Sequence, residues 1–214
     1  MFACPLCQHP ISSLFHTDKK RKYYRCHACA LVFVDPDTLP DRAQEKAEYD
    51  LHENSLHDEG YKAFLNKVAE PLCDRLAPLS RGLDFGCGPG PALAEMLNAR
   101  GFETVLYDPI YKPDLSVLDQ RFDFITCTEA VEHFHTPKKE WRLFYQMLKP
   151  QGLLAIMTKR VISQSRFSTW HYKNDPTHVS FYSDQTFVWL QNRFQLKIEY
   201  MANDVVIMRN TAKI

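Results

Sequence analysis

The sequence lacks the features that would tie it to a membrane or to a nucleic acid. No apolar run approaches the roughly 18 residues that a membrane-spanning helix needs. The N-terminus shows neither the basic segment nor the apolar core of a signal peptide. Acidic and basic side chains balance at 26 each, so the formal net charge is zero. This balance argues against a protein that mainly wraps nucleic acid, although a local basic patch stays open. We therefore expect no membrane partner and a cytoplasmic location.

The seven cysteines come without an export signal, which indicates a reducing compartment and metal-binding or packing roles instead of disulfides. Four of them form two C-x-x-C pairs, Cys4 with Cys7 and Cys26 with Cys29, and 18 residues separate the pairs. Four thiolates at this spacing are typical of a tetrahedral zinc ribbon, a closed site with no open position for catalysis. We predict structural zinc there and packing roles for the remaining cysteines, Cys73, Cys87 and Cys127.

The sequence divides into three predicted parts. Residues 1–34 form the zinc ribbon, 35–57 a polar linker with a short helix at 41–49, and 58–214 the main domain. The ribbon carries a basic and aromatic run, 19–25, which is typical of a phosphate-binding and base-stacking tip but also of a solvated hairpin turn, the interpretation we favour. As an alternative, a ribbon of this size could form one wall of the substrate-binding site of the larger domain.

The main domain alternates strands and helices, which predicts an open, Rossmann-like α/β sheet. An amphipathic helix at about 59–76 precedes the first strand. The last two strands lie close together in the chain and predict a terminal antiparallel hairpin. The further elements that we expect are strands at 82–86, 103–108, 122–127, 152–158, 195–201 and 204–209 and helices at 91–100, 137–148 and 183–192.

The most informative stretch is Leu-Asp-Phe-Gly-Cys-Gly-Pro-Gly at 83–90. Gly86, Gly88 and Gly90 allow a loop to pass close to a ligand, and the helix start that follows offers free backbone N–H groups. The next strand ends at Asp108, about 20 residues beyond the glycines, where a nucleotide-binding βαβ unit places its ribose partner. A glycine-rich turn is also common without a ligand, so the pair of features carries the argument.

Together these two motifs resemble those of the class I S-adenosylmethionine-dependent methyltransferases, over about residues 60–210. The resemblance implies that S-adenosylmethionine is the cofactor, that Asp84 and the glycine loop face its methionine part, and that Asp108 bonds its ribose. The alternative is a plain Rossmann-like domain for another nucleotide. The cofactor-binding residues predicted on this basis are Asp84, Phe85, Gly86, Cys87, Gly88, Gly90, Asp108, Pro109, Thr128 and Glu129.

One segment departs from the family pattern. Only thirteen residues, 109–121, separate Asp108 from the next strand. A full crossover needs at least about 10–12 residues by itself, so we expect the third strand of the usual sheet to be missing or vestigial. The usual adenine-binding acid then has only Asp114 and Leu115 as nearby substitutes.

The predicted catalytic residues follow the strand at 122–127. Glu129, Glu132 and His133 are spaced to share one face of a helical turn, and they can bind a divalent cation or hold a base. His178 lies in a later polar segment and has a pKa suited to a general base. The segment 160–172 between them predicts a loop that covers the substrate. Aromatic candidates for the acceptor pocket are Tyr49, Tyr61, Trp170, Tyr172, Phe181 and Tyr182.

Glu129, Glu132, His133 and His178 resemble the metal site of the small-RNA 3′-end 2′-O-methyltransferases, which implies Mg²⁺ or Mn²⁺. Glu132-His133 is also similar to the ubiquinone-type O-methyltransferases, and the ribbon with the late histidine segment to sugar C-methyltransferases that use a histidine base. A purely structural His178 stays an alternative.

We predict methyl transfer to a small molecule or to a terminal hydroxyl or carbon acceptor, with His178 as base. The alternatives are an RNA-directed, metal-assisted methyltransferase docked by the ribbon and a non-catalytic S-adenosylmethionine-binding protein. The motifs do not indicate an oligomeric state.

Overall fold

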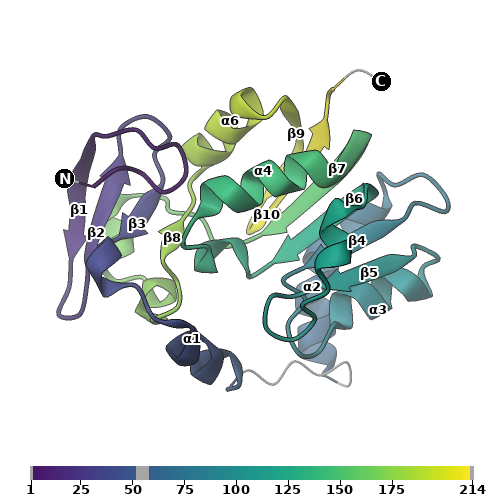
Figure 1. Cartoon of the computed structure of the whole chain (residues 1–214), viewed down its shortest axis with the longest axis horizontal. Coiled ribbons are helices and arrows are strands. Elements are labelled where there is room, and N and C mark those ends of the chain that lie inside the picture. Colours follow the sequence, from purple (N-terminus) through teal and green to yellow (C-terminus); the bar gives the residue numbers. More distant parts are fainter. Residues whose placement is uncertain (1, 52–57, 213–214) are drawn as a thin grey trace.

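The computed structural model describes residues 2–51 and 58–212. The part of the predicted linker at 52–57 lies outside these ranges. The structure holds two sheets, a large one with helices on both faces and a small one at one end of the molecule (Figure 1). No helix in the described ranges is long and apolar enough to cross a membrane.

The large sheet has the order β5-β4-β6-β7-β10-β9, and its first four strands are parallel. The last two run antiparallel as a hairpin, as predicted. This confirms the Rossmann-like α/β class with a terminal hairpin. Its strands are β4 (Gly82–Phe85), β5 (Thr104–Tyr107), β6 (Phe122–Thr128), β7 (Leu148–Met157), β9 (Leu196–Ala202) and β10 (Val205–Asn210).

The chain between β5 and β6 forms no strand. It contains a 3-10 helix, Leu115–Asp119, and an isolated bridge between Asp108 and Lys112. The predicted absence of the third strand is confirmed for this segment. Strand β7 begins at Leu148, four residues before the predicted start, because Leu148 already pairs with Phe122 of β6. The register then shifts before Leu153 pairs with Phe124, in a stretch where Gln151 has a positive φ.

Local sequence explains where the helices begin. Asp41, Asp58 and Ser183 accept backbone N–H groups of the first turn of α1, α2 and α6, and Asp41 and Ser183 complete capping boxes. The helices are α1 (Arg42–Tyr49), α2 (Glu59–Cys73), α3 (Ala92–Ala99), α4 (Pro137–Met147), α5 (Gln164–Ser168) and α6 (Asp184–Arg193).

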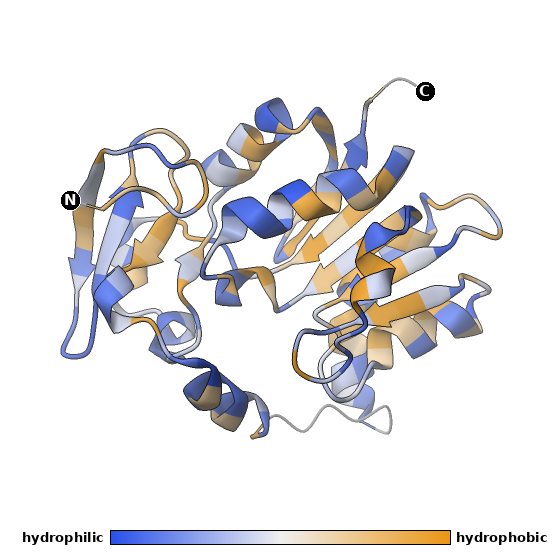
Figure 2. Cartoon of the chain, in the orientation of Figure 1, coloured by the Kyte–Doolittle hydropathy of each residue, from blue (hydrophilic) through white to orange (hydrophobic). Residues whose placement is uncertain are grey.

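Two apolar cores cover the two faces of the large sheet. Helices α2 and α3 bury residues such as Leu65 and Leu97 on one face, and α4 and α6 bury Trp141 and Phe187 on the other. Figure 2 shows the apolar strands between the two helix layers. This three-layer packing leaves the carboxyl ends of the parallel strands as the edge where open α/β sheets bind ligands.

The small sheet joins the N-terminal region to a distant part of the chain. Its order is β1-β2-β3-β8, with β1 (Ser12–Thr17), β2 (Lys22–Cys26), β3 (Val32–Val34) and β8 (Ser180–Phe181). Phe33 pairs with Ser180 and Val32 with Phe181. A third core of aromatic side chains fills the space beneath it. The N-terminal residues are thereby attached to the segment that carries His178 (Figure 1).

The predicted substrate-covering loop at 160–172 packs elsewhere. Helix α5 lies in this segment, and its Phe167 is buried against Phe15 and Tyr23 of the small sheet. None of the described residues of 160–172 lines the main cavity. The expectation of a covering loop is therefore wrong, because the aromatic side chains that suggested it form the third core.

Candidate functional site

The glycine loop follows β4 at the carboxyl edge of the large sheet. Gly86 and Gly88 have positive φ angles of 76° and 64°. The Gly86 amide donates to the Tyr107 carbonyl at 2.8 Å, which holds the loop against the end of β5. A Cβ on Gly86 would lie 2.8 Å from the Ala130 side chain, whereas one on Gly88 would meet no atom within 4 Å. Glycine is needed at 86 for space and backbone angle, and at 88 for backbone angle.

Asp108 fixes the same loop from the neighbouring strand. Its Oδ2 accepts the Gly88 N–H at 3.0 Å, and its Oδ1 accepts the N–H groups of Ile110 and Tyr111 at 2.8 and 2.9 Å. The side chain is only 7% exposed, yet it lines the cavity. A carboxylate oxygen can accept two hydrogen bonds. Oδ2 accepts one from the protein, so it can accept another from a ligand hydroxyl.

Asp84 is placed differently from the expectation. Its carboxyl group is buried within the sheet and accepts the Thr126 hydroxyl at 2.8 Å from the adjacent strand. Burial raises the pKa of Asp84 to about 6. Among the described residues that line the cavity, Asp84 is absent. In this structure it supports the strand pair beneath the loop.

A cavity of about 990 Å³ opens at this edge. It is large enough for a cofactor together with a small acceptor. Three predicted site residues, Asp84, Gly90 and Glu132, are outside the described lining. The predicted residues that line it are Phe85, Gly86, Cys87, Gly88, Asp108, Pro109, Thr128, Glu129, His133 and His178, and two of the six aromatic candidates, Tyr49 and Tyr61, join them. Of the proposed adenine contacts, Leu115 lines the cavity and Asp114 caps the 3-10 helix by accepting the Ser116 N–H.

Helix α1 covers part of the cavity, and Tyr49 is the residue of this helix that was predicted from the sequence as a pocket candidate. Glu45 Oε1 lies 2.9 Å from His135 Nε2, and the Tyr49 ring meets the His133 ring edge to face at 5.1 Å. The predicted linker helix is thus part of the site. In the sequence, this role was indicated only by Tyr49, the last residue of the helix.

A buried acidic pair lies beside the cavity. The Tyr172 hydroxyl contacts both Glu129 and Glu132, and the Thr158 hydroxyl donates to Glu132 at 2.9 Å. Burial raises the pKa of both carboxyl groups, and the nearby Glu129 carboxylate further raises the pKa of Glu132. Glu129 Oε1 is buried with no hydrogen-bond partner in the described structure and belongs to a residue that lines the cavity. It is suited to a cationic or N–H group of a ligand.

The predicted shared helical face does not form. Glu129 has a positive φ of 47°, and only Val131–His133 makes a 3-10 turn. Glu129 therefore directly follows the end of β6, whereas Glu132 and His133 belong to the 3-10 turn. Glu132, His133 and His178 nevertheless have potential ligand atoms within 4.8 Å of one another.

The two histidines use the same ring nitrogen to bond backbone carbonyls. His178 Nδ1 lies 2.7 Å from the Tyr172 carbonyl, and His133 Nδ1 lies 3.2 Å from the Thr177 carbonyl. A carbonyl oxygen only accepts, so each Nδ1 carries the proton of its hydrogen bond. His178 Nε2 is 3.7 Å from Asp175 Oδ2, and the ring centroids are 4.7 Å apart.

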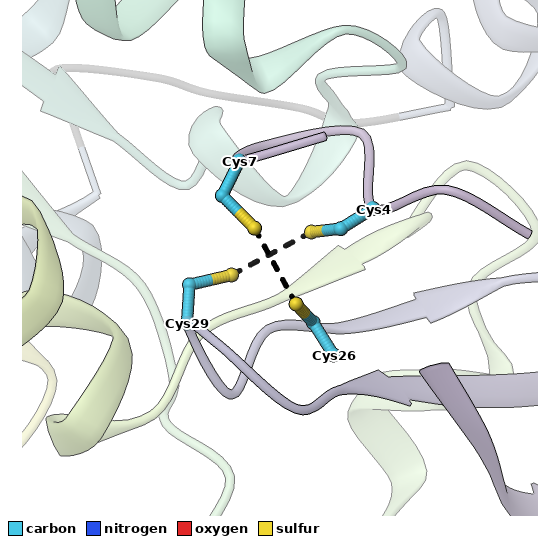
Figure 3. A group of neighbouring side chains, drawn as sticks. All are labelled: Cys4, Cys7, Cys26 and Cys29. Carbon is cyan, nitrogen blue, oxygen red and sulfur yellow. Dashed lines mark hydrogen bonds between the residues drawn. The ribbon is translucent and has the colours of Figure 1, made fainter. Parts of the chain in front are cut away.

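The four N-terminal cysteines converge on one point (Figure 3). Their sulfur atoms lie within 4.8 Å of one another, with Cys4 to Cys29 at 3.5 Å and Cys7 to Cys26 at 3.4 Å. Zn–S bonds of about 2.3 Å in a tetrahedron place sulfurs about 3.8 Å apart. The cluster therefore has the dimensions of such a site. All seven cysteines are described, and none is in a disulfide.

Comparison with known proteins identifies the large domain. A family model described as a methyltransferase domain matches residues 54–200. No curated protein matches. The 1,6-didemethyltoxoflavin N1-methyltransferase of Burkholderia thailandensis, solved with 1,6-didemethyltoxoflavin and S-adenosylhomocysteine, is 14% identical with a TM-score of 0.56, over 92% of this chain and 98% of that one. An S-adenosylmethionine-dependent methyltransferase of Methanosarcina mazei is also 14% identical, with a TM-score of 0.51 over 67% of this chain and 98% of that one. At these identities the likeness shows the fold, and the family match spans more than half of the chain. This chain therefore belongs to the methyltransferase domain family and has the fold of the S-adenosylmethionine-dependent methyltransferases.

Proposed function

We propose that the enzyme methylates a hydroxyl or carbon nucleophile of a small molecule, with His178 as general base. The observation that carries this proposal is the His178 ring itself. Its Nδ1 is held by the Tyr172 carbonyl, and the residue lines the cavity that adjoins the glycine loop. In the proposed role, the His178 ring takes a proton from the acceptor, and Asp175, whose Oδ2 lies 3.7 Å from Nε2, stabilises the imidazolium that results.

The residues present fit S-adenosylmethionine. The glycine loop and Asp108 form one wall of the cavity, and the partnerless Glu129 Oε1 offers a negative atom for the ammonium group of its methionine part. Bound there, the cofactor supplies an electrophilic methyl group on a sulfonium. Pro109 and Thr128 complete the proposed contacts, and Tyr49 and Tyr61 exclude water from the acceptor side.

In the proposed transfer, His178 would take the proton of the acceptor, whose oxygen or carbon would bond the methyl carbon. The sulfur–methyl bond would break, with S-adenosylhomocysteine as the leaving group. Glu132 is fully buried and is bonded to Tyr172 and Thr158, so we assign it a positioning role. It holds Tyr172, whose carbonyl in turn holds His178. His133 stands beside His178 and packs against Tyr49 at the cavity wall.

The test starts with calorimetric titration of S-adenosylhomocysteine, for which we expect micromolar binding. Pooled polar metabolites are then incubated with ¹³C-methyl S-adenosylmethionine, and mass spectrometry identifies the labelled product. We expect His178→Gln to lower kcat about 10²–10⁴-fold and to leave S-adenosylhomocysteine affinity unchanged. His171→Gln, at an exposed position in the same segment, is the matched control. Full turnover in His178→Gln would overturn the base assignment.

A second candidate is metal-assisted methylation of a ribose 2′-hydroxyl in RNA, which the convergence of Glu132, His133 and His178 favours. Two imidazole nitrogens and a carboxylate suit Mn²⁺ better than Mg²⁺, which prefers oxygen ligands. The Mn²⁺ affinity of the wild type and of His133→Ala tests the site. Steeply salt-dependent RNA binding tests the substrate, and both results together would replace the small-molecule proposal.

We further propose that Cys4, Cys7, Cys26 and Cys29 hold a structural zinc ion and that the protein resides in the cytoplasm. The converging, unpaired thiols support both statements, because reducing compartments keep cysteines available for metal. The predicted boundaries, with a ribbon at 1–34, a linker at 35–57 and the catalytic domain at 58–214, are retained as part of this proposal. Metal analysis of the purified chain tests the zinc assignment.

A further inference from the structure

Arg21 connects the small sheet to the segment that carries His178. It lies just before β2, and its side chain is only 8% exposed. Nη1 donates to the carbonyl oxygens of Pro176 and His178, both at 3.0 Å. Nη2 donates to the Asp175 carbonyl at 2.8 Å and to the Lys173 carbonyl. One guanidinium therefore contacts four backbone carbonyls within the six residues 173–178.

This arrangement requires the planar guanidinium. Its N–H groups point in several fixed directions, whereas a lysine ammonium is a single point with three donors. Buried carbonyls without a partner are costly. The segment 173–178 contains the end of the 3-10 helix His171–Asn174 and the bend and turn that follow it, and none of its residues belongs to a strand. Arg21 provides the partners that a strand or helix would otherwise provide.

The hairpin side of the contact is itself fixed. The Asp18 carboxylate accepts the backbone N–H groups of Lys20 and Arg21, both at 2.8 Å. The Lys173 ammonium and the Tyr23 hydroxyl also reach Asp18, each at 3.0 Å. Although burial opposes ionisation, these donors hold the pKa of Asp18 well below its usual range. The turn that positions Arg21 is thus bonded to the same segment that Arg21 bonds.

His178 lies between this contact and the strand pairing. Its own N–H donates to the Asp175 carbonyl at 3.3 Å, a carbonyl that also accepts from Arg21. Two residues later, Ser180 pairs with Phe33 of β3. The backbone of His178 is therefore held on both sides by the N-terminal sheet, although Arg21 lies outside the described cavity lining.

We propose that Arg21 is a positioning residue for methyl transfer: it fixes the backbone of residues 173–178 and thereby the direction of the His178 ring. The inference rests on the proposed role of His178 as base. It gives the N-terminal sheet a function in turnover that does not involve the cofactor. Arg21 belongs to the basic run at 19–25, a candidate nucleic-acid tip, but its side chain is turned inward toward the segment 173–178.

The test compares Arg21→Lys and Arg21→Ala with Arg25→Ala. Arg25 is the matched control, because it lies in β2 of the same hairpin and donates to Gln185 at 2.7 Å without reaching 173–178. In both Arg21 variants we expect amide exchange of 173–178 to rise about tenfold or more. We also expect loss of the His178 Nδ1–H signal in spectra of ¹⁵N-histidine-labelled protein. Wild-type behaviour is expected for Arg25→Ala.

The enzymatic readout uses the acceptor identified by the ¹³C-methyl screen. We expect kcat to fall about 100-fold in Arg21→Lys, the scale of a catalytic group misplaced by about 1 Å, with S-adenosylhomocysteine affinity unchanged. Guanidinium ion added to Arg21→Ala is expected to restore part of kcat and the Nδ1–H signal. Arg21→Lys covers the case in which the alanine variant does not fold.

A folded Arg21→Lys variant with wild-type exchange at 173–178 and an intact His178 signal would overturn the proposal. The exchange and spectroscopic results do not depend on turnover, which separates the two inferences. If Arg21→Lys loosens the segment while His178→Gln retains activity, the base assignment fails and the role of Arg21 in fixing the segment stands.

Discussion

Replacing Asp108 with asparagine tests how the glycine loop is held. The buried carboxylate accepts three backbone N–H groups, from Gly88, Ile110 and Tyr111, at 2.8–3.0 Å. The first bond joins β5 to the glycine loop, and the other two close the turn after β5. Asparagine has nearly the same shape but offers only one acceptor oxygen. Asp108→Asn therefore removes hydrogen-bond acceptance and charge while it preserves packing.

The magnitude follows from the geometry. The orientation that loses least keeps the amide oxygen on Ile110 and Tyr111 and places the NH₂ group against the Gly88 N–H. One bond to a charged acceptor, about 1.5–3 kcal/mol, is lost, and the other two become neutral bonds that contribute about half as much. We expect the free energy of unfolding to fall by about 3–6 kcal/mol. The freed glycine loop should lower S-adenosylhomocysteine affinity by about tenfold or more, the equivalent of 1.4 kcal/mol.

Urea denaturation followed by circular dichroism measures the first effect, and calorimetric titration measures the second. Asp114→Asn is the control: this exposed aspartate also accepts a backbone N–H, but asparagine caps a helix about as well. We expect its stability to stay within about 0.5 kcal/mol of the wild type. An Asp108→Asn variant with wild-type stability would refute the reasoning from the hydrogen bonds. A loss of stability with unchanged affinity would refute the proposed ribose contact.

Three further predictions concern separate parts of the chain. Gly86→Ala should destabilise the protein by about 1–3 kcal/mol more than Gly88→Ala in urea denaturation, because only the first Cβ meets Ala130. Asp84 binds its proton more tightly in the folded state, with a pKa of about 6, so its own contribution to stability should fall by about 3 kcal/mol as the pH rises from about 4 to 6. In urea denaturation, the change in stability over this range should therefore differ between the wild type and Asp84→Asn by about this amount. Cys29→Ser should lower the zinc content per chain and increase amide exchange in the N-terminal sheet, while calorimetry finds S-adenosylhomocysteine binding unchanged.

Much of the large domain could be predicted because its information is local. The apolar spacing of Leu65, Val68 and Leu72 gives α2 its buried face, and short apolar runs end at the glycine loop and at Asp108 as the parallel strands do. The missing third strand was predictable from chain length alone, since thirteen residues are too few for a strand between two crossovers. These features depend on periods and spacings within about twenty residues.

The remaining features depend on contacts between distant residues. Arg21 bonds a segment more than 150 residues later, and nothing near it in the chain marks it as buried. The aromatic segment at 160–172 has the composition of a binding loop, but β1 and β2 offer it an apolar surface to cover. Asp84 has a ligand-binding position in the motif, yet the Thr126 hydroxyl on the next strand engages its carboxyl group. Local patterns specify the elements, and the partner of each polar group is decided by the fold.

The two walls of the cavity have different structural supports, which leads to a final prediction. The wall proposed to bind the cofactor is held within the large sheet, by Asp108 and the glycine loop. The wall proposed to bind the acceptor, at His178, is held by the N-terminal sheet through Arg21 and through the pairing of β3 with β8. The two supports share no hydrogen-bond partner among the described residues, so their effects should be independent. In the double variant Asp108→Asn/Arg21→Lys, S-adenosylhomocysteine affinity should equal that of Asp108→Asn, and exchange at 173–178 should equal that of Arg21→Lys. A double variant whose cofactor affinity falls well below that of Asp108→Asn would show that the walls are coupled and that Arg21 does more than position His178.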